Sequence, residues 1–318
     1  MLRALTRGFM ANVSATPREL LLLVHTLLDT HAPGTTATAP REQHKLAVAA
    51  QAKGKAKAKG TKPSGEAIMA DFALQMLLLF LKHGIGARGA KQGQVAETAV
   101  AQEGDQAEQG SKQKHAGVSG GDPSRLELLA PFVPVLARCM REHSTAVVTT
   151  ALKCLAILCR YPLPNLRRHT DELARRSLSL LRSGVNASSP LSQECIKLLT
   201  SLLHSNAGWE ATNGQLRALI ESSFTDLEES NTQATTFRLL RVVLARRIVL
   251  DSVYTVMGRV QELLVRSQHA SVRQACHGAL VQFLLEYPLG PKRLRQHVEF
   301  LLVNLTFEHP TGRVAAAR

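Results

Sequence analysis

The sequence has few aromatic residues, which make up only 4% of its 318 residues, and Trp209 is its single tryptophan. Apolar residues nevertheless reach 45% of the chain. β-Sandwiches and β-barrels depend on aromatic and β-branched side chains, so this composition argues against both folds. No apolar run reaches about 18 residues without a charge, which excludes a membrane-spanning helix and a membrane partner.

The sequence also lacks the usual motifs of catalysis and metal binding. Its five cysteines form no Cys-x-x-Cys pair, and the step from Cys154 to Cys159 is not a zinc-ligand spacing. There is no His-Glu-x-x-His motif and no Gly-x-x-x-x-Gly-Lys-Ser/Thr loop. The cysteines are expected to be core residues in a reducing, intracellular setting. The chain is therefore predicted to be non-enzymatic, with no catalytic residue, metal, cofactor or small-molecule substrate.

The charge balance is strongly positive, with 39 Lys and Arg against 25 Asp and Glu and a formal net charge of +14. From residue 124 onward, 21 of the 24 basic residues are Arg. Arg makes bidentate contacts with phosphate and carboxylate groups, so an acidic partner is expected, with RNA as the first candidate. The alternative interpretation is a basic surface that serves only to keep the chain in solution.

Two helices and two linkers are predicted before the repeat region. Residues 1–30 are expected to supply an N-terminal helix that begins at Pro17, and residues 64–83 a second helix. Segments 31–63 and 84–123 lack bulky apolar residues and are expected to be disordered linkers. The first linker is basic, and its alternating lysines Lys53, Lys55, Lys57 and Lys59 are further candidate polyanion-binding residues. One side of the second helix is expected to carry the core residues Ile68, Phe72, Met76, Leu79 and Phe80.

The extreme N-terminus admits two interpretations. Three arginines precede the first acidic residue, Glu19, and this pattern resembles a mitochondrial presequence. The alternative is that Met1 is internal to a longer protein, in which case the segment is no leader.

From residue 124 the sequence is a succession of amphipathic helices that group into pairs. The expected pairs are 124–142 with 145–161, 164–183 with 190–205, 213–229 with 231–247, 251–267 with 270–287, and 291–308 with a helix from 311. Equivalent apolar positions recur every 38 to 44 residues, and a helical-hairpin period of about 40–47 residues is typical of HEAT and armadillo arrays. We therefore expect an all-α, HEAT/armadillo-like α-solenoid over 124–318, with four complete pairs and a truncated fifth.

The fifth pair is expected to leave apolar side chains uncovered. A helical-repeat array needs a polar cap at each end, whereas the helix 291–308 carries Val298, Leu301, Leu302 and Leu305. We expect these side chains to be exposed, and the chain to be a piece of a longer array.

Seven stretches occur in a recognisable order along the chain. They are ATPRELLLLVHTLL (15–28), MADFALQMLLLFLK (69–82), LLAPFVPVLARCM (128–140), TALKCLAILCRYPLPNL (150–166), QATTFRLLRVVLARR (233–247), EYPLG (286–290) and VEFLLVNLTFEHPTGR (298–313). Together they resemble the small-subunit processome component 20 family, also described as small nucleolar RNA-associated protein 20 or down-regulated-in-metastasis protein. The resemblance implies a nuclear and nucleolar scaffold for pre-18S ribosomal RNA processing in small-subunit biogenesis. It further implies pre-ribosomal RNA or small nucleolar RNA, and processome proteins, as partners.

One constellation of basic residues recurs at non-core positions in the predicted second helices. Its members are Lys153, Arg160, Lys197, Arg238, Arg241 and Arg273. In HEAT arrays the second helices line the concave side, so these residues are expected to form a basic stripe for an RNA backbone or an acidic helix. The scarcity of aromatics argues against base stacking. Two alternatives stay open: a solvated polar face, or pairing with Glu194, Glu221 or Glu228 inside the solenoid.

Two other functional classes share this architecture. A nuclear transport receptor-like adaptor would bind protein cargo, and a mitochondrial helical-repeat RNA factor would explain the basic N-terminus. Imaging of a tagged protein separates the three, because they predict the nucleolus, the nuclear rim and the mitochondrion.

Overall fold

The structure, a computed structural model, describes residues 17–31, 65–83, 123–183, 188–205, 208–224, 227 and 229–317. These residues are helices joined by turns and contain no β-strand. The chain divides into two compact units, residues 1–165 and residues 166–318. Each unit is described by itself.

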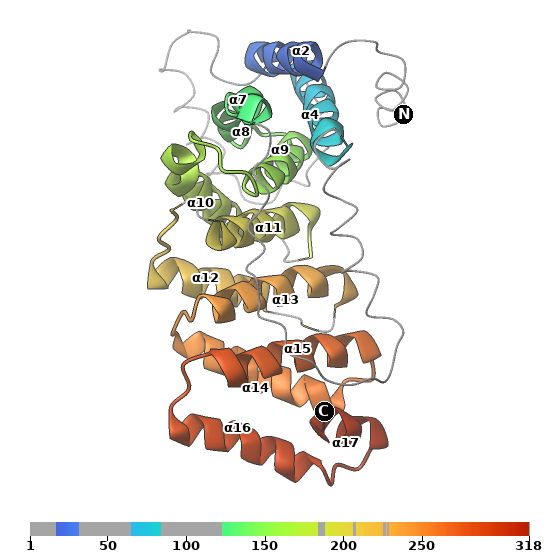
Figure 1. The fold of residues 1–318 in the computed structure, drawn as a ribbon. Helices are drawn as coiled ribbons and strands as arrows, with labels where there is room; N and C mark the ends of the chain where they lie inside the picture. Colours follow the sequence, from blue (N-terminus) through green and yellow to red (C-terminus); the bar gives the residue numbers. More distant parts are fainter. Residues whose placement is uncertain are drawn as a thin grey trace, which may run out of the picture. The chain divides into compact units, whose positions relative to one another are not determined.

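In unit 1, the described residues form two stacked helix pairs. Helices α2 (Pro17–His31) and α4 (Gly65–His83) form the first pair, and α8 (Phe132–Cys139) and α9 (Thr145–Leu158) form the second. Like helices meet between the pairs, because α2 packs on α8 and α4 packs on α9 (Figure 1). Arg138 forms an ion pair with Asp29, and Thr150 Oγ1 donates to the Asp71 carboxylate at 3.2 Å.

The buried side of α4 differs from the predicted one. Met76 is buried as expected, but Ile68 is 44% exposed, and Phe72, Leu79 and Phe80 are half-buried. The side that packs on α2 and α9 instead carries Ala70, Ala73, Leu74, Met76, Leu77 and Leu81. The small alanines allow neighbouring helices to pack closely on this side. Because α4 is apolar on nearly all sides, the spacing of its apolar residues did not show which side is buried.

A break divides the first helix of the second pair, which was expected to be one helix over 124–142. Helix α7 (Pro123–Leu129) ends before Pro131, and α8 begins after it. Proline has no N–H to donate to the preceding turn, and its ring clashes with the carbonyl four residues earlier. Pro131 thus ends one helix and starts the next.

The described residues of unit 2 form eight helices, and their pairs follow the predicted order. They are α10 (Leu166–Arg182), α11 (Pro190–His204), α12 (Asn213–Ser223), α13 (Ser230–Ala245), α14 (Asp251–Arg266), α15 (Ala270–Glu286), α16 (Pro291–Asn304) and α17 (Pro310–Ala317). First helices pack on first helices, from α10 to α12 to α14, and second helices on second helices, from α11 to α13 to α15 (Figure 1). This ladder is the packing that the repeat period predicted.

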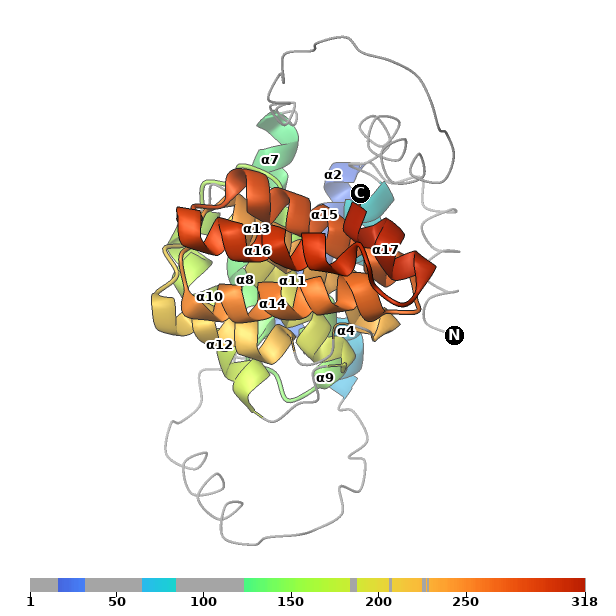
Figure 2. The same ribbon diagram turned by 90° about the horizontal axis from the view of Figure 1, so that it is seen from below.

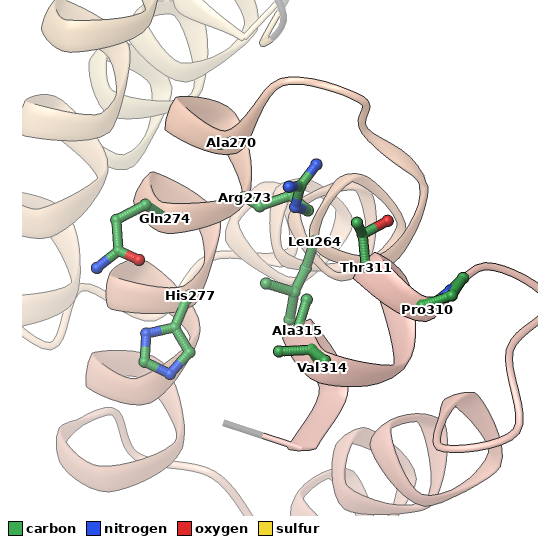
Figure 3. Close-up of a pocket in the computed structure, with 9 residues that line it drawn as sticks. All are labelled: Leu264, Ala270, Arg273, Gln274, His277, Pro310, Thr311, Val314 and Ala315. Atoms are coloured by element: carbon green, nitrogen blue, oxygen red, sulfur yellow. The ribbon is translucent and has the colours of Figure 1, made fainter. Parts of the chain in front are cut away.

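The fifth pair departs from this ladder, because its second helix, α17, packs against the first helix α14. Close approach at Gly312 permits the contact: a Cβ added there would lie 2.7 Å from the carbonyl oxygen of Val265. Between α15 and α17 a cavity of about 350 Å³ remains, lined by apolar Leu264, Val314 and Ala315 (Figure 3). The final pair is therefore splayed rather than stacked.

Helix α16 contacts the rest of unit 2 through aromatic and polar side chains. Its Arg293 guanidinium lies 3.6 Å from the centre of the Tyr254 ring. Its His297 ring meets Phe283 edge-on at 5.1 Å, and His297 Nδ1 lies 2.7 Å from Gln261 Oε1. No residue of α16 is buried. As predicted, Val298, Leu302 and Leu305 are exposed, whereas Leu301 is half-buried.

The remaining predictions divide between the described and undescribed parts of the chain. Residues 1–16, 32–64 and 84–122 lie outside the described residues, so the two linkers and the leader stay predictions. All five cysteines are buried and none forms a disulfide bond, as expected of core residues. Among the described helices, none combines the length and the apolar character needed to cross a membrane.

Candidate polyanion-binding surface

Helix α13 presents a basic stripe on its exposed side. Its Phe237, Leu240 and Val243 are buried where it packs on α11 and α15. The exposed positions follow steps of three and four, which places them on one side of the helix. They are Asn231, Ala234, Arg238, Arg241 and Ala245. Arg238 and Arg241, both predicted site residues, are thus adjacent on one surface.

Two further arginines extend this stripe past the end of α13. Arg246 and Arg247 are both exposed, and neither takes part in an ion pair within the described part of the chain. The segment 230–250 contains no Asp or Glu. We call Arg238, Arg241, Arg246 and Arg247 the α13 arginine cluster. Four cations within ten residues, in a segment without acids, favour an anionic partner. The Glu286 carboxylate lies near one side of this cluster, because Gln282 Nε2 donates both to it, at 3.0 Å, and to the Arg241 carbonyl.

The turn that carries Arg247 is strained. Arg247 has φ of 53° and is the one non-glycine residue of the described chain with a positive φ. Its N–H donates to the Leu244 carbonyl at 2.9 Å, and the Ile248 N–H donates to the Val243 carbonyl at 3.3 Å. This is the Schellman end of a helix, in which glycine is the usual left-handed residue. An L side chain there costs about 1–2 kcal/mol, so the helix ends on a charged residue at a conformational cost.

Helix α15 packs against α13 next to the α13 arginine cluster. A Cβ added to Gly278 would lie 3.1 Å from Arg241 Nη2, so the guanidinium lies over the α15 backbone at this glycine. Gln282 Nε2 donates to the Arg241 carbonyl at 3.3 Å and links the two helices. Arg241 therefore lies where α13 packs on α15, and not in a loop.

Lys197 has an internal role. It is the one residue of 191–203 in α11 that is not buried. Its Nζ lies 2.9 Å from Glu194 Oε1, and the Glu194 side chain is only 11% exposed. Lys197 therefore neutralises a buried carboxylate, as the alternative of pairing with Glu194 anticipated.

Arg273 also has an internal partner. Its Nη1 donates to the Ser267 carbonyl at 2.8 Å and closes the turn between α14 and α15. Arg313 repeats this arrangement one pair later, donating to the Phe307 carbonyl at 2.8 Å. Figure 3 shows Arg273 on the cavity between α15 and α17. Arg273 therefore serves a turn and does not join the α13 arginine cluster.

The other predicted site residues lie elsewhere. Lys153 is half-buried on α9 in unit 1, and Arg160 is exposed in the turn after α9 ends at Leu158. The two therefore do not share a helix face, although a spacing of seven residues would bring them together on a continuous helix. The lysines at positions 53, 55, 57 and 59 lie outside the described residues.

Sequence reasoning missed Arg246 and Arg247, although a signal was present. An Arg-Arg pair directly follows the last apolar residues of α13, in a segment without acids. The positive φ of Arg247 left no signal, because a left-handed helix end is usually recognised by its glycine.

Reactive thiols and metal clusters are not features of the described residues. Burial raises the pKa of Cys139, Cys159 and Cys195 to about 12, and the pKa of Cys154 is raised as well. Such thiols stay protonated and unreactive near neutral pH. Within the described ranges, no three His, Cys, Asp or Glu side chains come together as metal ligands would.

The stacked pairs and the arginine-bearing second helix define an all-α helical-repeat protein of the HEAT/armadillo type. No protein-family model matches the chain. Solved structures similar to it include an archaeal HEAT-like repeats protein from Thermococcus onnurineus NA1, 15% identical with a TM-score of 0.42 over 96% of both chains. A designed armadillo repeat protein is 11% identical with a TM-score of 0.43, over 81% of this chain and 93% of that one. At these scores the fold assignment rests on the helix pairing described above.

Two curated proteins confirm the family resemblance found in the sequence. The U3 small nucleolar RNA-associated protein 20 of Schizosaccharomyces pombe is 27% identical over 186 residues. Its namesake in Saccharomyces cerevisiae is 25% identical over 187 residues. The chain is thus similar to the U3 small nucleolar RNA-associated protein 20 family over 58% of its length, and it spans about 7% of the length of these relatives.

Proposed function

We propose that the chain is a non-enzymatic HEAT-repeat scaffold of the small-subunit processome, acting in pre-18S ribosomal RNA processing. The similarity to two proteins named U3 small nucleolar RNA-associated protein 20 supports this proposal. Pre-ribosomal RNA or small nucleolar RNA and processome proteins are then its partners, and the nucleolus its location. Imaging of the tagged chain tests the location: a mitochondrial or nuclear-rim signal would overturn it.

Within this role, the α13 arginine cluster contacts the RNA backbone. The observation that carries this assignment is the exposure of four arginines in and just after one helix, without an acid in 230–250. The surface offers arginines and no exposed aromatic ring on α13, so it suits phosphates and not stacked bases. Binding is therefore expected to be independent of RNA sequence and to weaken steeply with salt.

The experiment is a salt titration of RNA binding by wild type and by the double variant Arg238→Glu/Arg241→Glu. Each lost phosphate contact reduces the log–log salt slope by about 0.7 for single strands. We expect weaker binding to every unrelated RNA and a slope flatter by one to two contacts. Arg217→Glu on α12, an exposed arginine outside the cluster, is the matched control for loss of charge. Equal slopes for the double variant and wild type would exclude the cluster as the RNA site.

A further inference from the structure

Glu286 is an exposed acid beside the α13 arginine cluster. It is the last residue of α15, which packs on α13 in both views of the fold (Figure 1 and Figure 2). The hydroxyl of the next residue, Tyr287, donates a hydrogen bond to the carbonyl of Ile248, which directly follows Arg247. Glu286 therefore lies near the end of α13, where Arg246 and Arg247 are exposed.

The Glu286 carboxylate is held in place by a neutral side chain and not by a cation. The Gln282 amide group donates to Glu286 Oε2 at 3.0 Å and to the Arg241 carbonyl at 3.3 Å, so it fixes the acid relative to α13. Within the described ranges Glu286 forms no ion pair, and its second oxygen, Oε1, accepts no hydrogen bond. The side chain therefore offers a charged acceptor on a surface of arginines.

A carboxylate at this place affects DNA and RNA differently. An ionised carboxylate only accepts hydrogen bonds, as do the phosphate oxygens of a nucleic acid, so a DNA strand on the arginines is repelled by Glu286. RNA differs in the ribose 2′-hydroxyl, which donates as well as accepts. A 2′-hydroxyl of a strand that lies on the arginines can donate to Glu286 Oε1 in a charge-assisted hydrogen bond, which offsets the repulsion.

We infer that Glu286 makes the α13 arginine cluster selective for RNA over DNA by accepting a hydrogen bond from a ribose 2′-hydroxyl. The arginines bind phosphates of either nucleic acid, and Glu286 discriminates between the sugars. Every ribonucleotide carries the 2′-hydroxyl, so this selectivity is independent of base sequence, as the phosphate contacts are. The inference rests on the proposed contact between the cluster and the RNA backbone.

The experiment measures the Kd of the full chain for single strands of one sequence, made as RNA, as DNA and as 2′-O-methyl RNA. Wild type is expected to bind RNA about two- to tenfold more tightly than the other two, which is the range of one net hydrogen bond. The 2′-O-methyl strand retains the oxygen but has no proton to donate. It therefore separates the hydrogen bond from other differences between the two sugars.

Glu286→Ala is expected to bind DNA more tightly than wild type does and to lose the preference for RNA. Glu262→Ala, which removes an exposed acid of α14 outside the cluster, is the matched control and should retain the preference. Equal tightening of RNA and DNA by Glu286→Ala would overturn the inference, because the carboxylate then acts by repulsion alone. So would a wild type that binds 2′-O-methyl RNA as tightly as RNA. Failure of the proposed function is a different result, in which Arg238→Glu/Arg241→Glu binds all three strands as wild type does.

Discussion

The Tyr287 hydroxyl donates a hydrogen bond to the Ile248 carbonyl at 2.7 Å and so ties the end of α15 to the turn after α13. The same ring stacks on Phe283 at 5.1 Å and meets Tyr254 edge-on at 5.8 Å. Burial is the main reason that the pKa of Tyr287 is raised to about 12. Tyr287 thus holds together the turn that presents Arg246 and Arg247.

Replacing Tyr287 by phenylalanine is predicted to destabilise unit 2. The ring contacts remain, but the Ile248 carbonyl loses its donor, at a cost of about 1–2 kcal/mol. Urea denaturation followed by circular dichroism measures the change. Tyr161→Phe is the control, because no hydrogen bond of the Tyr161 hydroxyl occurs among the described residues. Equal loss in both variants would contradict the role given to the Tyr287 hydroxyl.

Replacing Arg247 by glycine is predicted to raise stability and weaken RNA binding together. Glycine adopts the left-handed conformation without the steric cost of an L side chain, and the net gain is up to about 1 kcal/mol after the greater freedom of the unfolded chain is included. One phosphate contact is lost at the same time. Thermal denaturation and a salt titration measure the two effects. Arg247→Lys retains both charge and strain, so it should change neither quantity much.

The protonation of His297 is predicted to lower the free energy of unfolding as the pH drops below the ordinary His pKa of about 6.5. Burial, helped by the nearby Arg293 charge, lowers the pKa of His297 in the folded chain. The unfolded chain therefore binds this proton more readily than the folded one, and acid favours unfolding. The stabilisation from neutral His297 is present above about pH 6.5 and is lost as the pH falls through its folded pKa.

The measurement is the free energy of unfolding of wild type and His297→Gln across the range about pH 5 to 8. The variant has no imidazole, so its stability should depend less on pH. Identical pH profiles would show that His297 does not contribute to the dependence.

Gly312→Ala is predicted to loosen α17 from α14. The new methyl group would approach the Val265 carbonyl oxygen to 2.7 Å, and such overpacking typically costs about 1–3 kcal/mol. Hydrogen exchange should accelerate in α17 and at the end of α14. Gly258→Ala is the matched control: no atom lies within 4 Å of its added Cβ, so this helix-interior change should stabilise the chain by about 0.5–1 kcal/mol.

The helix pairs were predictable from the sequence because each has one apolar side, and the turns between them are polar. The buried side of α4 was not, since Phe72, Leu78, Leu79 and Phe80 make it apolar on several sides and the choice depends on its neighbours. Of the α13 arginine cluster, only Arg238 and Arg241 were predicted from the sequence. Lys197 pairs with Glu194 one turn earlier in the same helix, and Arg273 donates to the Ser267 carbonyl in the preceding turn. Both pairings depend on how far each side chain extends. Docking of α17 on α14 was missed because periodicity does not identify the neighbouring helix.

Helices α2 and α4 form a pair although residues 32–64 separate them along the chain. Helix α4 is held by α2 and α9 through the Asp71–Thr150 hydrogen bond and the buried Leu74 and Leu77. Doubling the length of a flexible connection costs only about 0.6 kcal/mol. Lengthening the segment 32–64 should therefore cost unit 1 little stability, and the interruption between these helices is a place where evolution can add sequence without rebuilding the repeat.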